Sequence, residues 1–183
     1  MNALADEKVG RFLNTHFVSS YQKVGTFRVA DGQKQGGNVA CYFCTPHGQV
    51  LHVVAGPVRA EVFLREARWV IETHKLAVLE KRHGRHDLQD FFQQAHAERL
   101  NYEFGVAYIS PTPGSKSDSA TDPSALLAEP RYRNLPRQGL VHLLLAAPGS
   151  WDIQQLYRVV FERILGENIS TLPVAQASAP QRP

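Results

Sequence analysis

The 183 residues are 43% hydrophobic and 20% charged, which fits one domain, or one domain with an appendage, and excludes a disordered chain or a long multidomain enzyme. Twenty lysines and arginines against 17 aspartates and glutamates give a net charge of +3, an excess too small to indicate a nucleic-acid partner. The two cysteines are too few for a disulfide-stapled secreted domain or a four-cysteine zinc site within the chain.

The first elements in chain order are a helix and a strand. Apolar residues recur at helical spacing over residues 6–17, and Asp6 and Glu7 stand in the first turn, where acidic groups favour the positive end of the helix dipole. Residues 18–24 then read as a strand and residues 26–30 as a second short extended piece. The glycine-rich residues 31–38 predict a loop.

A hairpin follows. Two apolar runs, residues 39–44 and 49–55, flank a turn in which Pro46 has the preset φ of position i+1 and Gly48 suits position i+3. Gly56 and Pro57 end the second run. The sequence therefore predicts two antiparallel strands between residues 39 and 55.

The period becomes helical again from residue 59 to about residue 82, and the polar residues of this stretch, Glu66 among them, are expected on the solvent side. Gly84 ends that helix, and Asp87 is the N-cap of a further helix that reaches about Ala95. Large residues then alternate with small or polar ones over residues 101–110, which predicts a strand.

The remaining sequence is divided by residues 110–136, a stretch rich in Pro, Ser and Asp that we interpret as a linker or surface excursion. Two helices follow, over residues 138–147 and 152–165, the second capped by Asp152. We expect a core over residues 1–109, a helical extension over residues 137–170 and a frayed tail over residues 171–183.

The order helix, strand, loop, hairpin, glycine, helix resembles the C-terminal part of a thioredoxin-like domain of the bacterial type. The resemblance covers about 70 of the 183 residues. The matching segments are Asp6-Glu7-Lys8-Val9, Phe12-Leu13-Asn14, His16-Phe17-Val18, residues 43–51, Gly56 and Phe63-Leu64. It implies an α/β fold with a thioredoxin-like core, to which the helices after residue 137 add a mostly helical C-terminal extension.

Two departures from the family pattern bear on activity. The family's reactive CxxC stands at the start of the helix matched here by residues 6–17, where the helix terminus lowers the thiol pKa, and no cysteine stands there. The residue that opens the hairpin in the family is a cis-proline that holds substrate peptide, and Val39 occupies that position. A cis bond before a residue other than proline costs about 2.5 to 4 kcal/mol, so we expect a trans bond.

Cys41-Tyr42-Phe43-Cys44 is itself a CxxC pattern. Three strand steps separate the two Cα atoms by about 10 Å and turn the two side chains to opposite faces, whereas a disulfide requires less than about 7 Å. We therefore interpret Cys41 and Cys44 as small apolar residues of a strand and keep them as an alternative redox pair. Val39 is a candidate substrate-binding residue through the resemblance alone.

The densest histidine cluster in the sequence surrounds the helix break at Gly84. Its members are His74, His83, His86 and His96. Ligands of one metal must converge, and a helix break separates these, so we expect a solvated junction and no metal site. No glycine pattern follows a strand as phosphate binding requires, and the sequence predicts no cofactor.

The preferred interpretation is a noncatalytic interaction or scaffold module with a protein partner. The alternative is a thiol–disulfide oxidoreductase that uses Cys41 and Cys44, or a CxxC upstream of Met1. A missing N-terminal strand would leave a sheet edge open, to be filled by residues 101–110 or by a second copy in a homodimer. With no signal peptide visible and no apolar run near the roughly 20 residues of a membrane helix, we expect a cytoplasmic protein without a membrane partner.

Overall fold

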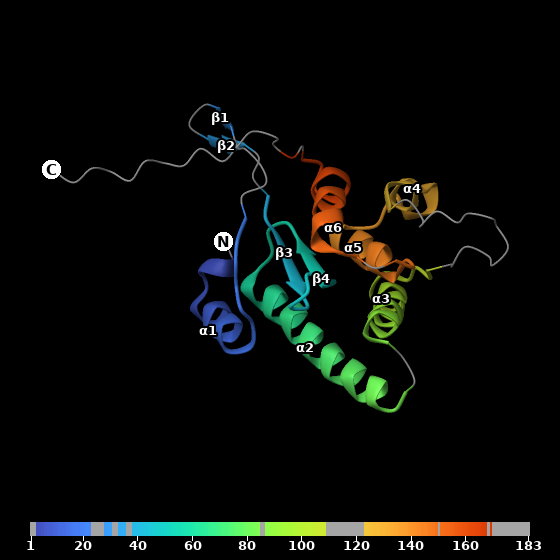
Figure 1. Ribbon diagram of the computed structural model, residues 1–183. Coiled ribbons are helices and arrows are strands. Elements are labelled where there is room, and N and C mark those ends of the chain that lie inside the picture. Colours follow the sequence, from blue (N-terminus) through green and yellow to red (C-terminus); the bar gives the residue numbers. More distant parts are fainter. Residues whose placement is uncertain are drawn as a thin grey trace.

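The computed structural model describes residues 3–22, 28–30, 33–35, 38–84, 87–108, 123–149, 151–167 and 169. Within them the chain is a mixed helix and strand protein in which helices predominate (Figure 1). The tail expected over residues 171–183 lies outside the described residues. No described helix has the combination of length and apolar character that crossing a membrane needs.

The central element is an antiparallel hairpin of β3 (Ala40–Cys44) and β4 (Val50–Ala55), as the sequence predicted. Ala40 lies opposite Ala55, and the register shifts between Phe43 and Cys44. All six residues of β4 are buried, whereas β3 is mostly half-buried and, among the described strands, pairs with β4 alone. A second small hairpin, β1 (Arg28–Ala30) with β2 (Gln33–Gln35), is separate from it. In that segment the sequence had predicted a loop over residues 31–38.

Helices cover both faces of the central hairpin. On one face lie η1 (Ala3–Ala5), α1 (Glu7–His16) and α2 (Ala60–Arg82), which pack on Phe43, Leu51 and Val54. On the other lie α5 (Arg137–Ala146), α6 (Ile153–Val159) and its π-helical continuation η3 (Val160–Ile164). The helical extension of the sequence analysis thus supplies one wall of the core.

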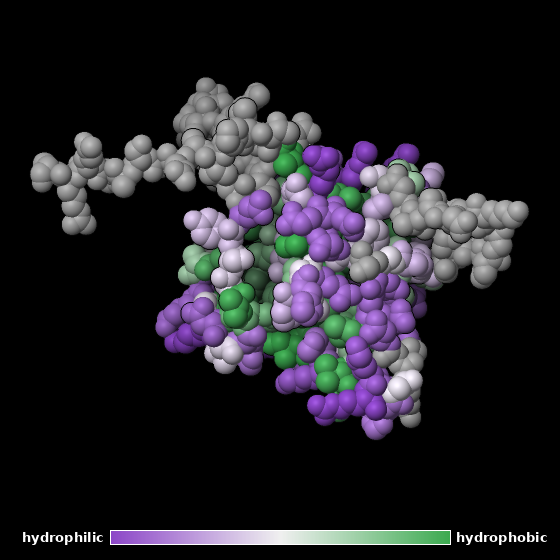
Figure 2. Space-filling view, viewed as in Figure 1, coloured by the Kyte–Doolittle hydropathy of each residue, from purple (hydrophilic) through white to green (hydrophobic). Residues whose placement is uncertain are grey.

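The remaining helices close the side of the molecule. α3 (Leu88–Phe104) packs along α5 and α2, and α4 (Pro123–Ala128) with η2 (Pro130–Tyr132) packs on α5. Residues 123–132 were expected in a linker, but Leu126 and Tyr132 are buried in a small apolar cluster with Leu100 and Leu143. Figure 2 shows hydrophilic residues over most of one molecular face, with smaller hydrophobic patches between them.

Capping side chains set several of the boundaries. Asp6, Asp87 and Asp152 each accept a hydrogen bond from a backbone N–H of the first turn, of α1, α3 and α6 respectively. The predictions for α1, for α2 and for the N-cap of α3 are confirmed.

Two predicted strands are wrong. Residues 18–22 form no strand, and Val18 and Tyr21 are 103% and 98% exposed, because no neighbouring strand offers them a ladder; residues 23 and 24 lie outside the described range. Residues 101–104 continue α3, which ends at Gly105 in the left-handed conformation, and Tyr102 is 91% exposed. Residues 105–108 are irregular, so the described part of this segment does not fill the sheet edge; residues 109 and 110 lie outside the described range.

Candidate functional site

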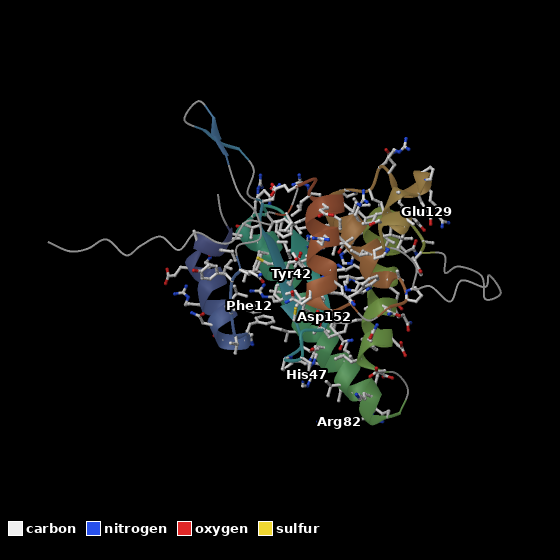
Figure 3. All side chains as sticks on the ribbon, turned by 45° about the horizontal axis from the view of Figure 1, so that its top comes forward. Phe12, Tyr42, His47, Arg82, Glu129 and Asp152 are labelled. Atoms are coloured by element: carbon white, nitrogen blue, oxygen red, sulfur yellow. The ribbon has the colours of Figure 1, made fainter. Side chains whose placement is uncertain are left out.

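The two cysteines lie on opposite faces of β3. Cys41 packs with the α1 and α2 side of the core, and Cys44 packs with the α5 and α6 side. Both thiols are free, and burial raises the pKa of each to about 11, with the carboxylate of Asp152 adding to the shift at Cys44. Figure 3 shows Asp152 and Tyr42 in this part of the molecule. Such thiols are protonated near neutral pH and are weak nucleophiles.

Val39 immediately precedes β3 and is 48% exposed. Its carbonyl oxygen accepts a hydrogen bond from the Gly56 N–H at 2.8 Å, which fixes the entry to the hairpin. No peptide bond of the described residues is cis. The residue therefore closes the hairpin with its backbone and leaves its side chain partly in solvent.

The histidines singled out by sequence density are not brought together. His83 is exposed, His74 is half-buried, and His86 lies outside the described residues. His96, by contrast, is 1% exposed in the core. No described group of three or more histidine, cysteine or carboxylate side chains has an arrangement that could hold a metal ion.

The structure instead forms a buried polar cluster, which we call the core cluster, from four different elements. Its members are His52 of β4, Glu66 of α2, His96 and Arg99 of α3, and His142 of α5. None is more than 9% exposed. The sequence analysis had placed Glu66 on the solvent side of its helix, which is wrong, since its carboxylate is directed to this cluster.

An ion pair forms one half of the core cluster. Arg99 Nη2 donates to Glu66 Oε1 at 2.9 Å, Nη1 lies 2.6 Å from Oε2 in the same ion pair, and Nε donates to Glu103 at 2.6 Å. From the surface, Arg65 Nη2 reaches Glu66 Oε1 at 3.0 Å. Two guanidinium groups thus face two carboxylates, which balances the charge that burial would otherwise penalise.

The three histidines form the other half and stack closely. Their ring centroids are 5.0 to 5.4 Å apart, and Trp69 packs edge-on against all three while the Arg99 guanidinium lies 4.8 Å from its ring centroid. His96 Nδ1 and His142 Nδ1 are 2.8 Å apart, His96 Nε2 is 2.9 Å from the Leu51 carbonyl oxygen, and His52 Nε2 is 3.2 Å from Glu66 Oε2.

The partners assign the ring protons. A carbonyl oxygen only accepts, so His96 carries its proton on Nε2 and its Nδ1 accepts from the Nδ1–H of His142. His52 donates from Nε2 to the carboxylate of Glu66. Each ring is then neutral, and two ring nitrogens, His52 Nδ1 and His142 Nε2, are buried without a hydrogen-bond partner.

Burial sets the protonation states. It lowers the pKa of His52, His96 and His142, so all three imidazoles stay neutral in the folded protein. Burial alone would raise the pKa of Glu66, but hydrogen bonds from His52 and Arg99 outweigh it and bring the pKa to about 2. The core cluster therefore holds an ionised carboxylate beside three uncharged rings.

The core cluster offers little room for a substrate. A void of about 20 Å³ touches His96, and Gln49, Gln89 and Gln93 close it by hydrogen bonds to one another and to the Gly149 carbonyl oxygen. That space suits about one water molecule. The arrangement is that of a structural polar core linking β4 to three helices.

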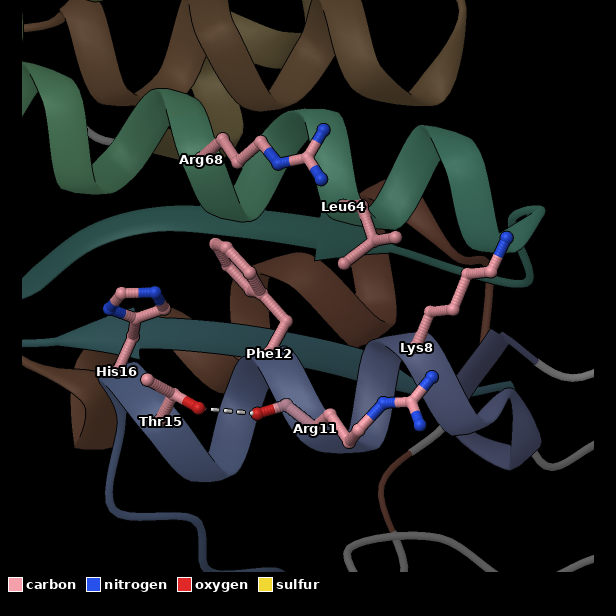
Figure 4. Close-up of a pocket in the computed structure, with 7 residues that line it drawn as sticks. All are labelled: Lys8, Arg11, Phe12, Thr15, His16, Leu64 and Arg68. Atoms are coloured by element: carbon pink, nitrogen blue, oxygen red, sulfur yellow. Dashed lines mark hydrogen bonds between the residues drawn. The ribbon is translucent and has the colours of Figure 1, made fainter.

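A larger groove lies elsewhere, between α1 and α2 (Figure 4), with a volume of about 360 Å³. The groove is lined by three cationic side chains, one histidine, two apolar side chains and one threonine. These residues are Lys8, Arg11, Phe12, Thr15, His16, Leu64 and Arg68. The sequence analysis missed this groove because it forms only when two helices some 50 residues apart in the chain pack together.

The sequence and the structure were compared with known proteins. No family model matches the chain, and no curated protein or solved structure matches it. The residues and their geometry are therefore the basis for a function.

Proposed function

We propose that the chain is a noncatalytic interaction or scaffold module built on a thioredoxin-like core that lacks the family's redox element. The helix α1, the hairpin of β3 and β4, Gly56 and α2 follow one another as the family pattern requires and support the thioredoxin-like part of the proposal, although the β1 and β2 hairpin stands between α1 and β3 and residues 18–22 form no strand. Gly56 has a φ of +86°, which explains why glycine stands at the junction between the hairpin and the helix. The noncatalytic part rests on the state of the thiols.

One observation carries it: the only two cysteines lie on opposite faces of one strand, with pKa values of about 11. The thiolate is the nucleophile in thiol–disulfide exchange, and at pH 7 only roughly one such thiol in ten thousand is ionised. An attacking thiol also needs a resolving thiol on its own side, which the alternation of side chains along β3 denies.

An insulin-reduction assay with dithiothreitol as electron source tests the proposal, with a thioredoxin as positive control. We expect no turnover above the rate with dithiothreitol alone, and the same rate for Cys41→Ser and Cys44→Ser. Turnover that either substitution abolishes would support the alternative, an oxidoreductase acting through Cys41 and Cys44. The genomic sequence upstream of Met1 tests the other form of the alternative, because an in-frame CxxC there would supply the missing redox pair.

The free edge of β3 is our proposed site for a homodimer. This strand pairs with β4 alone among the described strands, and Val39, which immediately precedes it, is an exposed apolar residue. An open edge of this kind pairs readily with a second strand. Light scattering at increasing concentration should show dimers, and a mass that stays monomeric at high concentration would exclude this version.

A further inference from the structure

The positively charged side chains of the groove between α1 and α2 are distributed along its length. Lys8, Arg11 and His16 follow one another along α1, with His16 about two turns beyond Lys8 (Figure 4). Arg68 extends from α2 on the opposite wall. The positive groups are therefore spread along a trough and do not converge on one point.

The charge in this groove is available to a partner. No aspartate or glutamate is among its lining residues. Arg11 pairs with Glu7 at 2.7 Å, but neither Lys8 nor Arg68 forms an ion pair with a described carboxylate, even though Glu72 lies one helical turn beyond Arg68. The guanidinium of Arg68 lies instead 5.6 Å from the ring centroid of Phe12, at the groove.

The same groove has an apolar floor. Phe12 points from α1 toward α2, and Leu64 points from α2 toward α1 (Figure 4). Both side chains are half-buried, so part of their apolar surface is still in contact with water. A ligand that covers them gains about 25 cal/mol for each Å² of apolar surface removed from water.

We propose that this groove binds an acidic peptide segment of a partner protein, with one apolar side chain on Phe12 and Leu64 and carboxylates beside Lys8 and Arg68. The proposal rests on the interaction role given above and names its partner class. A small anion satisfies convergent charges, whereas a chain with several carboxylates matches charges spread along a trough. The apolar floor adds a contact that an inorganic anion cannot use.

Fluorescence anisotropy with a labelled peptide of glutamates flanking a single leucine tests the proposal on the full chain. We expect saturable binding that weakens about tenfold between roughly 0.05 M and 0.5 M NaCl, because salt screens exposed charges. Lys8→Glu and Arg68→Glu should each weaken binding about tenfold, since each replaces an attraction by a repulsion. Arg133→Glu is the matched control, an exposed arginine beside α4 on the far side of the molecule from α1, and should bind as the wild type.

Three further binding measurements test which chemical groups of the ligand the groove recognises. A peptide with glutamines in place of the glutamates, and one with glycine in place of the leucine, should both bind more weakly, and inorganic phosphate should compete poorly. Equal binding by the glutamine peptide, by phosphate or by a single-stranded oligonucleotide, or unchanged affinity in both charge reversals, would overturn the proposal. None of these outcomes bears on the insulin-reduction assay. A failure of the peptide-binding proposal can therefore be told apart from a failure of the noncatalytic proposal.

Discussion

Acidification should destabilise this protein steeply through the core cluster. His52, His96 and His142 are neutral in the folded protein because burial lowers the pKa of each, whereas in the unfolded chain each titrates near the usual value of about 6.5. Below that pH the unfolded chain binds more protons than the folded one. The free energy of unfolding therefore falls as the pH falls through this window.

The magnitude follows from linkage. A histidine that stays neutral in the folded protein across the whole window costs about 1.4 kcal/mol of stability between about pH 7.5 and pH 5.5, so the three together cost up to about 4 kcal/mol. Glu66 does not contribute in this window, because its folded pKa of about 2 matters only below the unfolded carboxyl value of roughly 4.3. A loss of this size is a large part of the 5 to 15 kcal/mol or so that stabilises a typical domain.

Urea unfolding followed by circular dichroism at several pH values between these limits measures the effect. His142→Leu removes one buried imidazole and should reduce the pH dependence by about a third, whatever its effect on absolute stability. His47→Gln, in the exposed turn between β3 and β4, is the matched control and should leave the dependence unchanged. Unfolding free energies that agree at about pH 7.5 and pH 5.5 would refute the assignment of three neutral buried histidines.

Three other outcomes are expected. Glu66→Leu leaves Arg99 buried with Glu103 as its remaining carboxylate and should lower the free energy of unfolding by about 3 kcal/mol. The double variant Glu66→Leu, Arg99→Met should lose less stability than this, because no charge is left buried without its partner. A double variant whose loss equals the sum of the two single losses would contradict an energetic coupling between Glu66 and Arg99. Native alkylation followed by mass spectrometry should label Cys41 and Cys44 far more slowly than in urea, because both thiols are partly buried and protonated; rapid native labelling would count against the assignment. Gly56→Ala should destabilise the protein more than Gly84→Ala. Both glycines have a positive φ, but of the two added Cβ atoms only the one at residue 56 would meet a neighbour, Arg137 Nη1 at 3.0 Å. Equal losses of stability in urea unfolding would mean that the Arg137 side chain moves aside freely.

Short-range sequence patterns correctly predicted those helices and strands whose buried faces are apolar. The hairpin follows from two apolar runs around Pro46 and Gly48, and α1 from apolar residues at helical spacing. Asp87 was identified as an N-cap from its place before a periodic run. In each case the residues that decide the conformation lie within a few positions of one another.

The extent of α3 was missed because its buried face is polar. Phe92, His96 and Arg99 repeat at helical spacing and are all buried, but two of the three are residues that normally face water. The alternation over residues 101–110 then dominated the local pattern, although helical spacing continues to Phe104. A helix whose buried face carries ionisable groups gives a weak amphipathic signal.

The core cluster was missed for a related reason. Its histidines stand at positions 52, 96 and 142, so no short window of the sequence contains two of them. A usable signal existed nonetheless, since His52 lies between Leu51 and Val53 and His142 between Val141 and Leu143. A histidine enclosed by apolar residues in a predicted core element is a candidate for burial, and it needs a polar partner there.

Two arginines of this fold, Arg99 and Arg68, differ in whether a described carboxylate pairs with them. Arg99 forms ion pairs with the carboxylates of Glu66 and Glu103 in the core. Its charge is therefore neutralised within the fold, and the pair with Glu66 joins α3 to α2. Arg68, only two residues beyond Glu66 on α2, points to the opposite side, where no described carboxylate pairs with it. Because a helix turns about 100° per residue, neighbouring positions on α2 serve these two purposes without interfering. Lys8 and Arg68 therefore bring to the α1 and α2 groove positive charge that no described carboxylate pairs, which is the charge that the proposed acidic partner would use.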